Sequence, residues 1–249
     1  MIGPLGMGQL DVGAGTVAAS LYNAVAQNIT IRAVADKGSM RQGYGFSGLL
    51  VRKDLVDSGR YKTYADLKGM KLAVGTFGSA NASAMNEALK KGGLKWSDAA
   101  SIVALVFPQH IVAYQNKAID ASMTNEPTST TAVQNGLAVR VAGNDEIYPS
   151  QQTAVVLYSE NFARQRPQIA QKFMRAYVRA VRDYNDALQD GHIAGPHAAS
   201  GAPADKLVEL HGPAARRPAW AVAVARRWKP VSIVSNARES RRAAKLAMN

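Results

Sequence analysis

The chain has 249 residues, of which 47% are hydrophobic, and a formal net charge of +12. This length is enough for one large domain or two smaller ones, each with its own core. The sequence contains no cysteine, which excludes disulfides, thiolate metal sites and cysteine nucleophiles. No run of about 18 apolar residues occurs, so no membrane span is predicted. The first residues lack the basic and hydrophobic regions of a signal peptide.

Positive charge is concentrated in the last part of the sequence. Residues 191–249 contribute +7 of the net charge. A basic segment of this kind could bind nucleic acid or anionic lipid. The interpretation that we favour is a solvated or irregular basic tail.

Hydrophobic patterning predicts alternating strands and helices up to about residue 190. The expected strands are 9–12, 29–35, 46–51, 72–74, 100–106, 118–124, 137–141 and 153–158. The expected helices are 17–27, 79–91, 109–116, 127–134 and 167–188, with short turns at 52–59 and 64–69. This alternation indicates an α/β fold with mostly parallel sheets, in which ligands bind at the carboxyl ends of strands.

The segment Lys71–Asn81 predicts a buried strand, a glycine-flanked turn and the start of a helix. Gly75 and Gly78 permit the turn, and Ser79 is the expected N-cap of the helix. Free N–H groups at such a helix start point toward one spot and favour an anion or another polar acceptor. An ordinary βα turn with no ligand is the alternative.

A second glycine-containing segment, Gly13–Ala18, matches the dinucleotide-binding pattern G-x-G-x-x-A. It follows a short expected strand and opens a helix, and Asp36 stands 21 residues after Gly15, at the end of the next strand. This pattern keeps open a nucleotide-dependent oxidoreductase that uses Gly13, Gly15 and Asp36.

Asn125-Glu126-Pro127 places an amide and a carboxylate at the end of an expected strand. These groups can orient a polar ligand, or Asn125 can cap the next helix with Glu126 in its first turn. The four histidines show no metal-ligand spacing, and no nucleophile and base form a recognisable set. The sequence therefore predicts no metal site and no catalytic residue.

Several segments together resemble the periplasmic solute-binding proteins of the nitrate/sulfonate/taurine class, which are related to binders of thiamine-pyrimidine precursors. The resemblance covers residues 8–194 and depends on the order and spacing of the segments. These segments are Gly8–Gly13, Leu49–Leu55, Asp66–Val74, Ala118–Ala121, Asn125–Pro127 and Phe173–Tyr177.

The resemblance implies an α/β, two-lobed type II periplasmic binding-protein fold with a ligand cleft between the lobes. It implies the extracytoplasmic solute-binding component of an ABC importer, which delivers a small-molecule ligand to a permease without catalysis or a cofactor. The ligand would be polar or anionic, such as a sulfonate, nitrate, an aromatic compound or a pyrimidine-like compound. A periplasmic monomer without a nucleic-acid partner is expected.

The resemblance also assigns ligand contacts to seven positions of this sequence. Main-chain N–H groups with Ser79 or Asn81 would hold a polar or anionic group, and Glu126 would suit an amine or ring N–H. The seven positions are Gly15 and Thr16 in a lobe I loop, Ser79, Ala80 and Asn81 at a helix start in lobe II, and Asn125 and Glu126 at a neighbouring strand end.

By the same resemblance, residues 1–70 and 152–194 form lobe I and residues 71–151 form lobe II, with connecting strands near Lys71 and Gln152. Family members begin with an export signal and an opening strand–helix–strand before the position of Gly8, so lobe I is expected to be incomplete here. Residues 195–249 differ from the family's C-terminal helices. Their Arg/Ala/Pro texture suggests an out-of-frame reading of a GC-rich gene, which translation of the other frames would test.

Two further functions are weighed against solute binding. Pyrimidine synthases with a similar fold call for a cysteine-rich motif, which this chain lacks. Nucleic-acid binding through the tail would appear as salt-sensitive DNA retention that is lost when residues 196–249 are removed.

Overall fold

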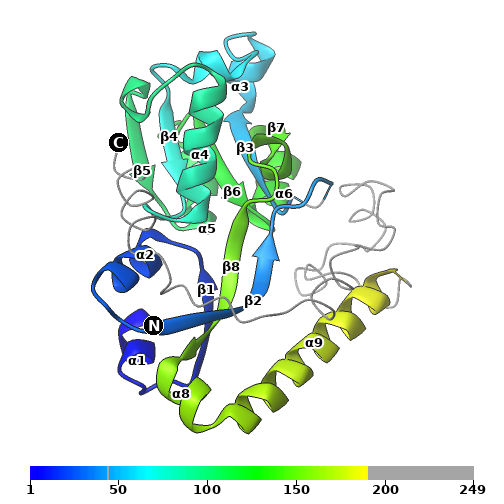
Figure 1. Cartoon of the computed structure of the whole chain (residues 1–249). Coiled ribbons are helices and arrows are strands. Elements are labelled where there is room, and N and C mark those ends of the chain that lie inside the picture. Colours follow the sequence, from blue (N-terminus) through cyan, green and yellow to red (C-terminus); the bar gives the residue numbers. More distant parts are fainter. Residues whose placement is uncertain (44, 190–249) are drawn as a thin grey trace. The chain divides into compact units, whose positions relative to one another are not determined.

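The computed structural model describes residues 1–43 and 45–189, and their contacts divide the chain into two compact units (Figure 1). Unit 1 contains Met1–Gly15, Ala19–Lys37 and the described residues from Ala154 onward. Unit 2 contains Thr16–Ala18 and Gly38–Thr153. The basic tail predicted at 195–249 lies outside the described residues.

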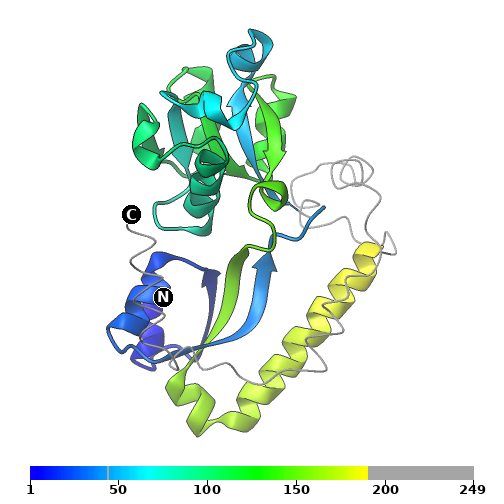
Figure 2. The ribbon, with the colours of Figure 1, turned by 45° about the horizontal axis from the view of Figure 1, so that its top comes forward.

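Unit 1 is built on a three-stranded sheet in the order β1-β8-β2 (Figure 2). Alternate side chains of the strands pack into two different clusters, as the pleat requires. Helices α1 and α2 supply residues to one cluster, and α8 and α9 supply residues to the other. The elements are α1 Ile2–Gly6, β1 Val12–Thr16, α2 Ala19–Ala26, β2 Ile31–Ser39, β8 Gln152–Ser159, α8 Glu160–Gln165 and α9 Pro167–Gln189.

Unit 2 is built on a five-stranded mixed sheet in the order β5-β4-β6-β3-β7. Strand β4 pairs in parallel with β5 and β6, whereas β3 pairs antiparallel with β6 and β7. Its strands are β3 Ser47–Arg52, β4 Lys71–Val74, β5 Ser101–Ala104, β6 Ala121–Asn125 and β7 Ala138–Gly143. Its helices are α3 Lys53–Asp57, η1 Tyr64–Leu67, α4 Ala80–Lys91, η2 Trp96–Asp98, α5 Phe107–Gln115, α6 Thr128–Gln134 and α7 Asn144–Ile147.

Both faces of the unit 2 sheet are covered by helices, so its central strands are buried on both sides. Leu49 and Val51 of β3 face a cluster with α4, whereas Leu50 between them faces a cluster with α5 and α6. In β4, Leu72 and Val74 face the cluster with α4, and Ala73 between them faces the cluster with α5 and α6. Such strands read as continuous apolar runs in the sequence, which is why 46–51 and 72–74 were predictable as strands.

The predicted strand–turn–helix from Lys71 to Gly93 is confirmed. Ser79 caps α4 by accepting a hydrogen bond from the N–H of Ala82 at 3.3 Å. The helix ends at Lys91, and Gly93 just beyond it has a φ of 70°, a backbone conformation that favours glycine.

Three sequence-based expectations differ from the structure. The strand expected at 29–35 extends further, because β2 continues through Ser39. The sheet of unit 2 is mixed because β3 runs antiparallel to its neighbours. The compact unit that contains the range 71–151 also contains residues 38–70, because β3 pairs with β6 and β7. Strand pairing between segments distant in sequence carries no local signal, which explains these differences.

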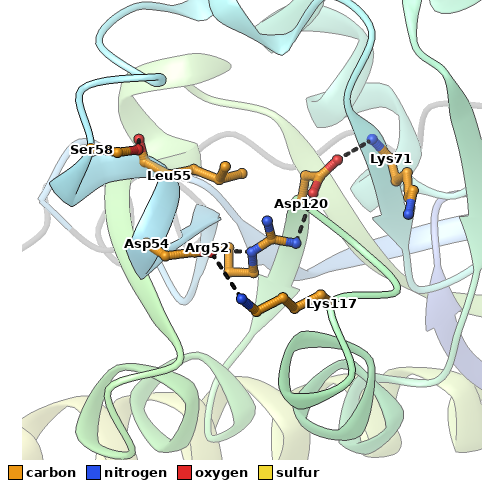
Figure 3. A network of polar contacts seen from close by, with 7 residues as sticks. All are labelled: Arg52, Asp54, Leu55, Ser58, Lys71, Lys117 and Asp120. Carbon is orange, nitrogen blue, oxygen red and sulfur yellow. Dashed lines mark hydrogen bonds and ion pairs between the residues drawn. The ribbon is translucent and has the colours of Figure 1, made fainter.

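Asp120 connects two strand ends at one edge of the unit 2 sheet (Figure 3). Its Oδ1 accepts from Nη1 of Arg52 at 2.9 Å, at the end of β3. Its Oδ2 accepts from the N–H of Lys71 at 2.9 Å, at the start of β4. Arg52 also donates to Asp54, which lies near Lys117. Arg52 and Asp120 are only 13% and 15% exposed, so water cannot fully replace these contacts.

We predict that Asp120→Ala lowers the free energy of unfolding by about 2 kcal/mol, because it leaves a largely buried guanidinium and an N–H without their acceptor. Urea unfolding followed by circular dichroism measures this loss. The matched control is Asp57→Ala, which breaks an exposed i,i+4 pair with Lys53 and should change stability by less than about 0.5 kcal/mol. Equal losses in the two variants would contradict the prediction.

A second ion pair gives unit 1 an acid-sensitive contribution to stability. Arg32 of β2 donates to both carboxylate oxygens of Glu160 at 2.6 and 2.7 Å, and Arg164 contacts the same carboxylate. Hydrogen bonding from Arg32 lowers the pKa of Glu160 to about 2. Because the folded-state pKa is depressed, this contribution is complete above the unfolded-state pKa and is lost as the pH falls toward 2.

We therefore expect Glu160→Gln to be less stable than the natural chain at pH 7, and this difference to shrink as the pH falls below about 4.5. Unfolding free energies measured in urea over this pH range test the expectation. Glu87→Gln, which removes an i,i+3 pair with Lys90, is the control and should show little difference at any pH. A difference for Glu160→Gln that does not vary with pH would rule out the ion pair as its cause.

Candidate functional site

The carboxyl ends of β4, β6 and β7 meet the start of β3 at one edge of the unit 2 sheet. This follows from the parallel pairing of β4 with β6 and the antiparallel pairing of β3 with β6 and β7. Polar side chains and the turn after β4 lie together at this edge, and helix α4 begins there. We call this region the polar edge; it comprises Ser47, Gly75, Ser79, Ala80, Asn81, Asn125, Glu126 and Arg140.

Asn81 lies at the centre of the polar edge. Its Oδ1 accepts from the N–H of Gly75 at 3.0 Å, which fixes the turn after β4. Its Nδ2 lies 3.4 Å from both Ser47 Oγ and Asn125 Oδ1, which are long contacts for hydrogen bonds. Asn81 therefore holds together the end of β4, the start of β3 and the end of β6.

Ser79 is also engaged by the protein itself. Its hydroxyl donates to the carbonyl of Thr76 at 2.7 Å and accepts from Ala82. Its backbone forms an isolated antiparallel bridge with Ala18. The N–H of Val17 donates to the carbonyl of Thr153 at 2.9 Å, so the short segment Thr16–Ala18 is fixed beside the start of α4 within unit 2.

Ala80 is held in place through a buried amide pair. Its carbonyl accepts from Nε2 of Gln151 at 2.8 Å. Oε1 of Gln151 in turn accepts from Nδ2 of Asn144 at 2.9 Å. Gln151 and Asn144 are both buried, so their hydrogen bonds fix the position of the Ala80 carbonyl in the first turn of α4.

Glu126 forms an internal ion pair. Its Oε1 accepts from Nη1 of Arg140 at 3.2 Å, and its Oε2 accepts from the N–H of Thr130 at 2.9 Å in the first turn of α6. The Glu126 side chain is only 5% exposed. Nη2 of Arg140 also donates to the carbonyls of Gly45 and Ser47 at 2.7 and 3.2 Å. Both charges are therefore engaged within the protein.

The structure brings most of the residues that the sequence singled out into unit 2. Ser79, Ala80, Asn81, Asn125 and Glu126 all lie at the polar edge. Thr16 belongs to the same unit and lies two residues before Ala18, which is bridged to Ser79.

Gly15 is the exception, because it belongs to unit 1. A Cβ at this position would lie 2.5 Å from the terminal methyl carbon of Met1, so the Met1 side chain would have to shift. Its predicted role in a ligand loop is therefore not tested by the geometry of the polar edge.

Sequence reasoning missed Ser47, Arg140 and Gln151. Arg140 carried a usable signal, because a cation between Val139 and Val141 in an apolar strand requires a buried partner. Gln151 carried no local signal, since its partner Ala80 is 71 residues away.

The dinucleotide-binding hypothesis is wrong. Gly13 and Gly15 lie inside strand β1, which continues to Thr16, and α2 begins only at Ala19. The tight turn that would bring a helix N-terminus against a pyrophosphate is therefore not formed. Cβ atoms at Gly13 and Gly15 would meet the side chains of Leu5 and Met1, so both glycines pack within unit 1.

The first turn of α4 provides the hydrogen-bond donors that the side chains do not. Ala82 and Ser83 donate their N–H groups to Ser79 Oγ and to the Ser79 carbonyl. The N–H groups of Ala80 and Asn81 have no partner within the helix, because the carbonyls four residues before them lie outside it. Together with the positive end of the helix dipole, these two donors favour an anionic oxygen.

Within the residues that the structure describes, no helix is long and apolar enough to cross a membrane. The same residues contain no group of three His, Asp or Glu side chains that could hold a metal ion.

The chain is similar to solved structures of binding proteins. The alkanesulfonate-binding protein SsuA from Xanthomonas axonopodis pv. citri, bound to MOPS, is 19% identical, with 98% of this chain and 75% of that chain covered and a TM-score of 0.65. The periplasmic nitrate-binding protein NrtA from Synechocystis PCC 6803 is 13% identical, with 76% and 53% covered and a TM-score of 0.56. These similarities confirm the predicted α/β fold of two-lobed periplasmic binding proteins.

An enzyme shares this fold. The desulfurization enzyme DSZB is 17% identical, with 96% of this chain and 86% of that chain covered and a TM-score of 0.62. The fold is therefore compatible with both binding and catalysis. No curated protein sequence matches the chain significantly.

The sequence profile of the NMT1-like family matches residues 8–194, the same range over which the sequence resembles nitrate/sulfonate/taurine-binding proteins. A match over most of the chain establishes the family, and the sulfonate- and nitrate-binding structures agree with it. The chain belongs to the NMT1-like family and has the solute-binding fold of these proteins.

Proposed function

We propose that this protein is the extracytoplasmic solute-binding component of an ABC importer. It binds a small polar or anionic ligand in the periplasm as a monomer and passes it to a permease, without catalysis. Membership of the NMT1-like family and the similarity to sulfonate- and nitrate-binding proteins support this proposal.

The proposed ligand class depends on which groups at the polar edge are already hydrogen-bonded within the protein. The hydroxyl of Ser79 and the carboxylate of Glu126 are already hydrogen-bonded within the protein. The donors that α4 leaves to a ligand are the N–H groups of Ala80 and Asn81. We assign these two groups to the ligand's anionic end, as in binding of a sulfonate, nitrate or carboxylate.

The remaining predicted residues take supporting roles in this proposal. Asn81 and Asn125 hold the turn and the strand ends, and Glu126 with Arg140 fixes the segment between β6 and α6. Thr16 and Gly15 stay assigned to a ligand loop, which would contact the rest of the ligand. An aromatic or pyrimidine-like body is compatible with this arrangement.

Hinge closure of the two units around the ligand is the proposed binding mechanism. The chain passes between the units at four points, after residues 15, 18, 37 and 153. Strands β2 and β8 each include one of these crossings. A few residues in these strands would absorb the change in backbone angles on closure.

The similarity to DSZB keeps a catalytic alternative in view, and one experiment separates the two. We expect a thermal melt of the purified chain to be cooperative and to shift upward with one class of compound, because a ligand that binds only the folded state stabilises it. The panel contains nitrate, taurine, alkyl and aryl sulfonates, aromatic carboxylates, pyrimidines and biphenyl-2-sulfinate. Sulfonate buffers such as MOPS are replaced by Tris chloride.

Each stabilising compound is then recovered and analysed by mass spectrometry. Recovery of unchanged compound supports a binding protein. Conversion of the compound during incubation would replace the proposal with an enzyme. A cooperative melt that no compound shifts would contradict binding of these ligand classes.

A substitution at the first residue of α4 tests the assigned donors. Ala80→Pro removes one N–H while keeping the helix start, because proline is well accepted at the first helical position. Ser79 before it is already extended, with φ −93° and ψ 168°, as a residue preceding proline requires. We expect about tenfold weaker binding of the most stabilising panel compound, measured by calorimetric titration.

The control at the same position is Ala80→Gly, which keeps the N–H and should bind within about threefold of the natural chain. If Ala80→Pro folds and binds as tightly as Ala80→Gly, the ligand is not held by the start of α4.

A further inference from the structure

A chain of buried polar side chains crosses the face of the unit 2 sheet that α5 and α6 cover, and neither the fold nor the proposed ligand site explains it. His110, Ser122 and Thr124 are 0% exposed and Tyr114 is 2% exposed. The contacts run from the Leu105 carbonyl through His110, Thr124, Ser122 and Tyr114 to the Leu50 carbonyl. We call it the His110 chain.

Five contacts connect the His110 chain, and all have hydrogen-bond distances. Nε2 of His110 lies 3.1 Å from the Leu105 carbonyl, and Nδ1 lies 2.8 Å from Thr124 Oγ1. Thr124 Oγ1 lies 2.6 Å from Ser122 Oγ, which lies 2.7 Å from the Tyr114 hydroxyl. The Tyr114 hydroxyl lies 3.0 Å from the Leu50 carbonyl.

The carbonyl at one end determines the direction of every hydrogen bond. A carbonyl only accepts, so Tyr114 must donate its single proton to Leu50. Burial raises the pKa of Tyr114, which keeps this proton in place. Tyr114 must then accept from Ser122, and Ser122 from Thr124, because each hydroxyl has one proton. Thr124 can accept in turn only from Nδ1 of His110.

This direction produces a conflict at the other end. The Leu105 carbonyl also only accepts, so its contact requires a proton on Nε2. Five contacts need five protons, whereas three hydroxyls and a neutral imidazole supply four. The neutral histidine therefore leaves one contact without a proton, and the Nε2 contact at 3.1 Å is the longest of the five.

We propose that His110 is a buried proton-binding site. Its neutral form carries its proton on Nδ1 and donates it to Thr124, and its Nε2 binds a second proton that it donates to the Leu105 carbonyl. The second proton comes from solvent and breaks no covalent bond. It adds one positive charge and completes the fifth hydrogen bond.

Charged side chains on the elements packed against this site are exposed or paired elsewhere: β4 carries the exposed Lys71 at its start, and β7 carries Arg140, which is paired with Glu126. Helix α6 and strands β5 and β6 contain no charged residue, and α5 has only His110 and Tyr114 as titratable groups. Strand β3 contributes Arg52 at its far end, paired with Asp54 and Asp120. The ring of Phe107 meets the imidazole edge to face, with centroids 5.6 Å apart.

Two opposing effects set the proton affinity of this site. Burial lowers the pKa of His110, and the hydrogen bond with the Leu105 carbonyl raises it. Because burial is the larger effect, the second proton binds below the ordinary range of histidine. The site therefore gains its second proton only at acidic pH. It connects Leu105, after β5, to Thr124 of β6, and Thr124 precedes Asn125 at the polar edge.

Long-range ¹H–¹⁵N correlation spectra of the imidazoles in the full ¹⁵N-labelled chain test this proposal without any ligand. The signals of His110 are assigned through the backbone of residue 110 and thereby separated from those of His192, His197 and His211. At about pH 8, above the ordinary pKa of histidine, we expect Nδ1 to be protonated and Nε2 to be bare. As the pH falls, Nε2 should become protonated while Nδ1 stays protonated. A neutral form with the proton on Nε2 would overturn the proposal.

A conservative variant tests the direction of the chain. Ser122→Ala removes the acceptor of the Thr124 proton, so Thr124 becomes free to donate to Nδ1. The neutral imidazole should then switch to the form with its proton on Nε2. Ser129→Ala is the control, because Ser129 Oγ is buried and has no hydrogen-bond partner; it should leave the pattern unchanged. No switch in Ser122→Ala would also overturn the proposal.

Discussion

The central constraint in this protein is that the middle strands of the unit 2 sheet are buried on both faces. A polar group there must find a partner within the protein, since water is excluded. Most polar groups therefore lie at the two edges of the sheet. Asp120 joins β3 to β4 at one edge, and Asn81 joins the turn after β4 to β3 and β6 at the other. The His110 chain lies between these edges, and it links its groups to one another with one contact left without a proton when His110 is neutral.

The same constraint bears on how a ligand would be held. The polar side chains of the polar edge are engaged in keeping strands and turns in place, as Glu126 shows most clearly. In the proposed site, the ligand's anionic oxygen is bound by main-chain N–H groups at the start of α4, which read little of the rest of a ligand. The fold itself is shared by sulfonate- and nitrate-binding proteins and by an enzyme, so one fold can carry different functions.

Much of the local structure could be predicted from the sequence. Apolar runs located β3 and β4, and Ser79 with Gly92 and Gly93 located both ends of α4, because these signals act over a few residues. The glycine pattern at Gly13 and Gly15 misled, since both glycines lie within a strand whose neighbours are the Met1 and Leu5 side chains, and no phosphate-binding turn forms there. The extent of unit 2 was also missed, because β3 finds its partners about 70 and 90 residues further along the chain.

The sequence by itself determined the order of the elements, the capped start of α4 and membership of the family, all of which depend on local patterns or on their order. Only the tertiary structure decided which polar groups are occupied. The tertiary structure pairs Arg140 with Glu126 and lets Gln151 donate to the Ala80 carbonyl. It also connects His110 to Tyr114 through Thr124 and Ser122 of strand β6. A hydrogen bond depends on distance and direction in space, and residues that are far apart in sequence meet these conditions only after the strands have paired.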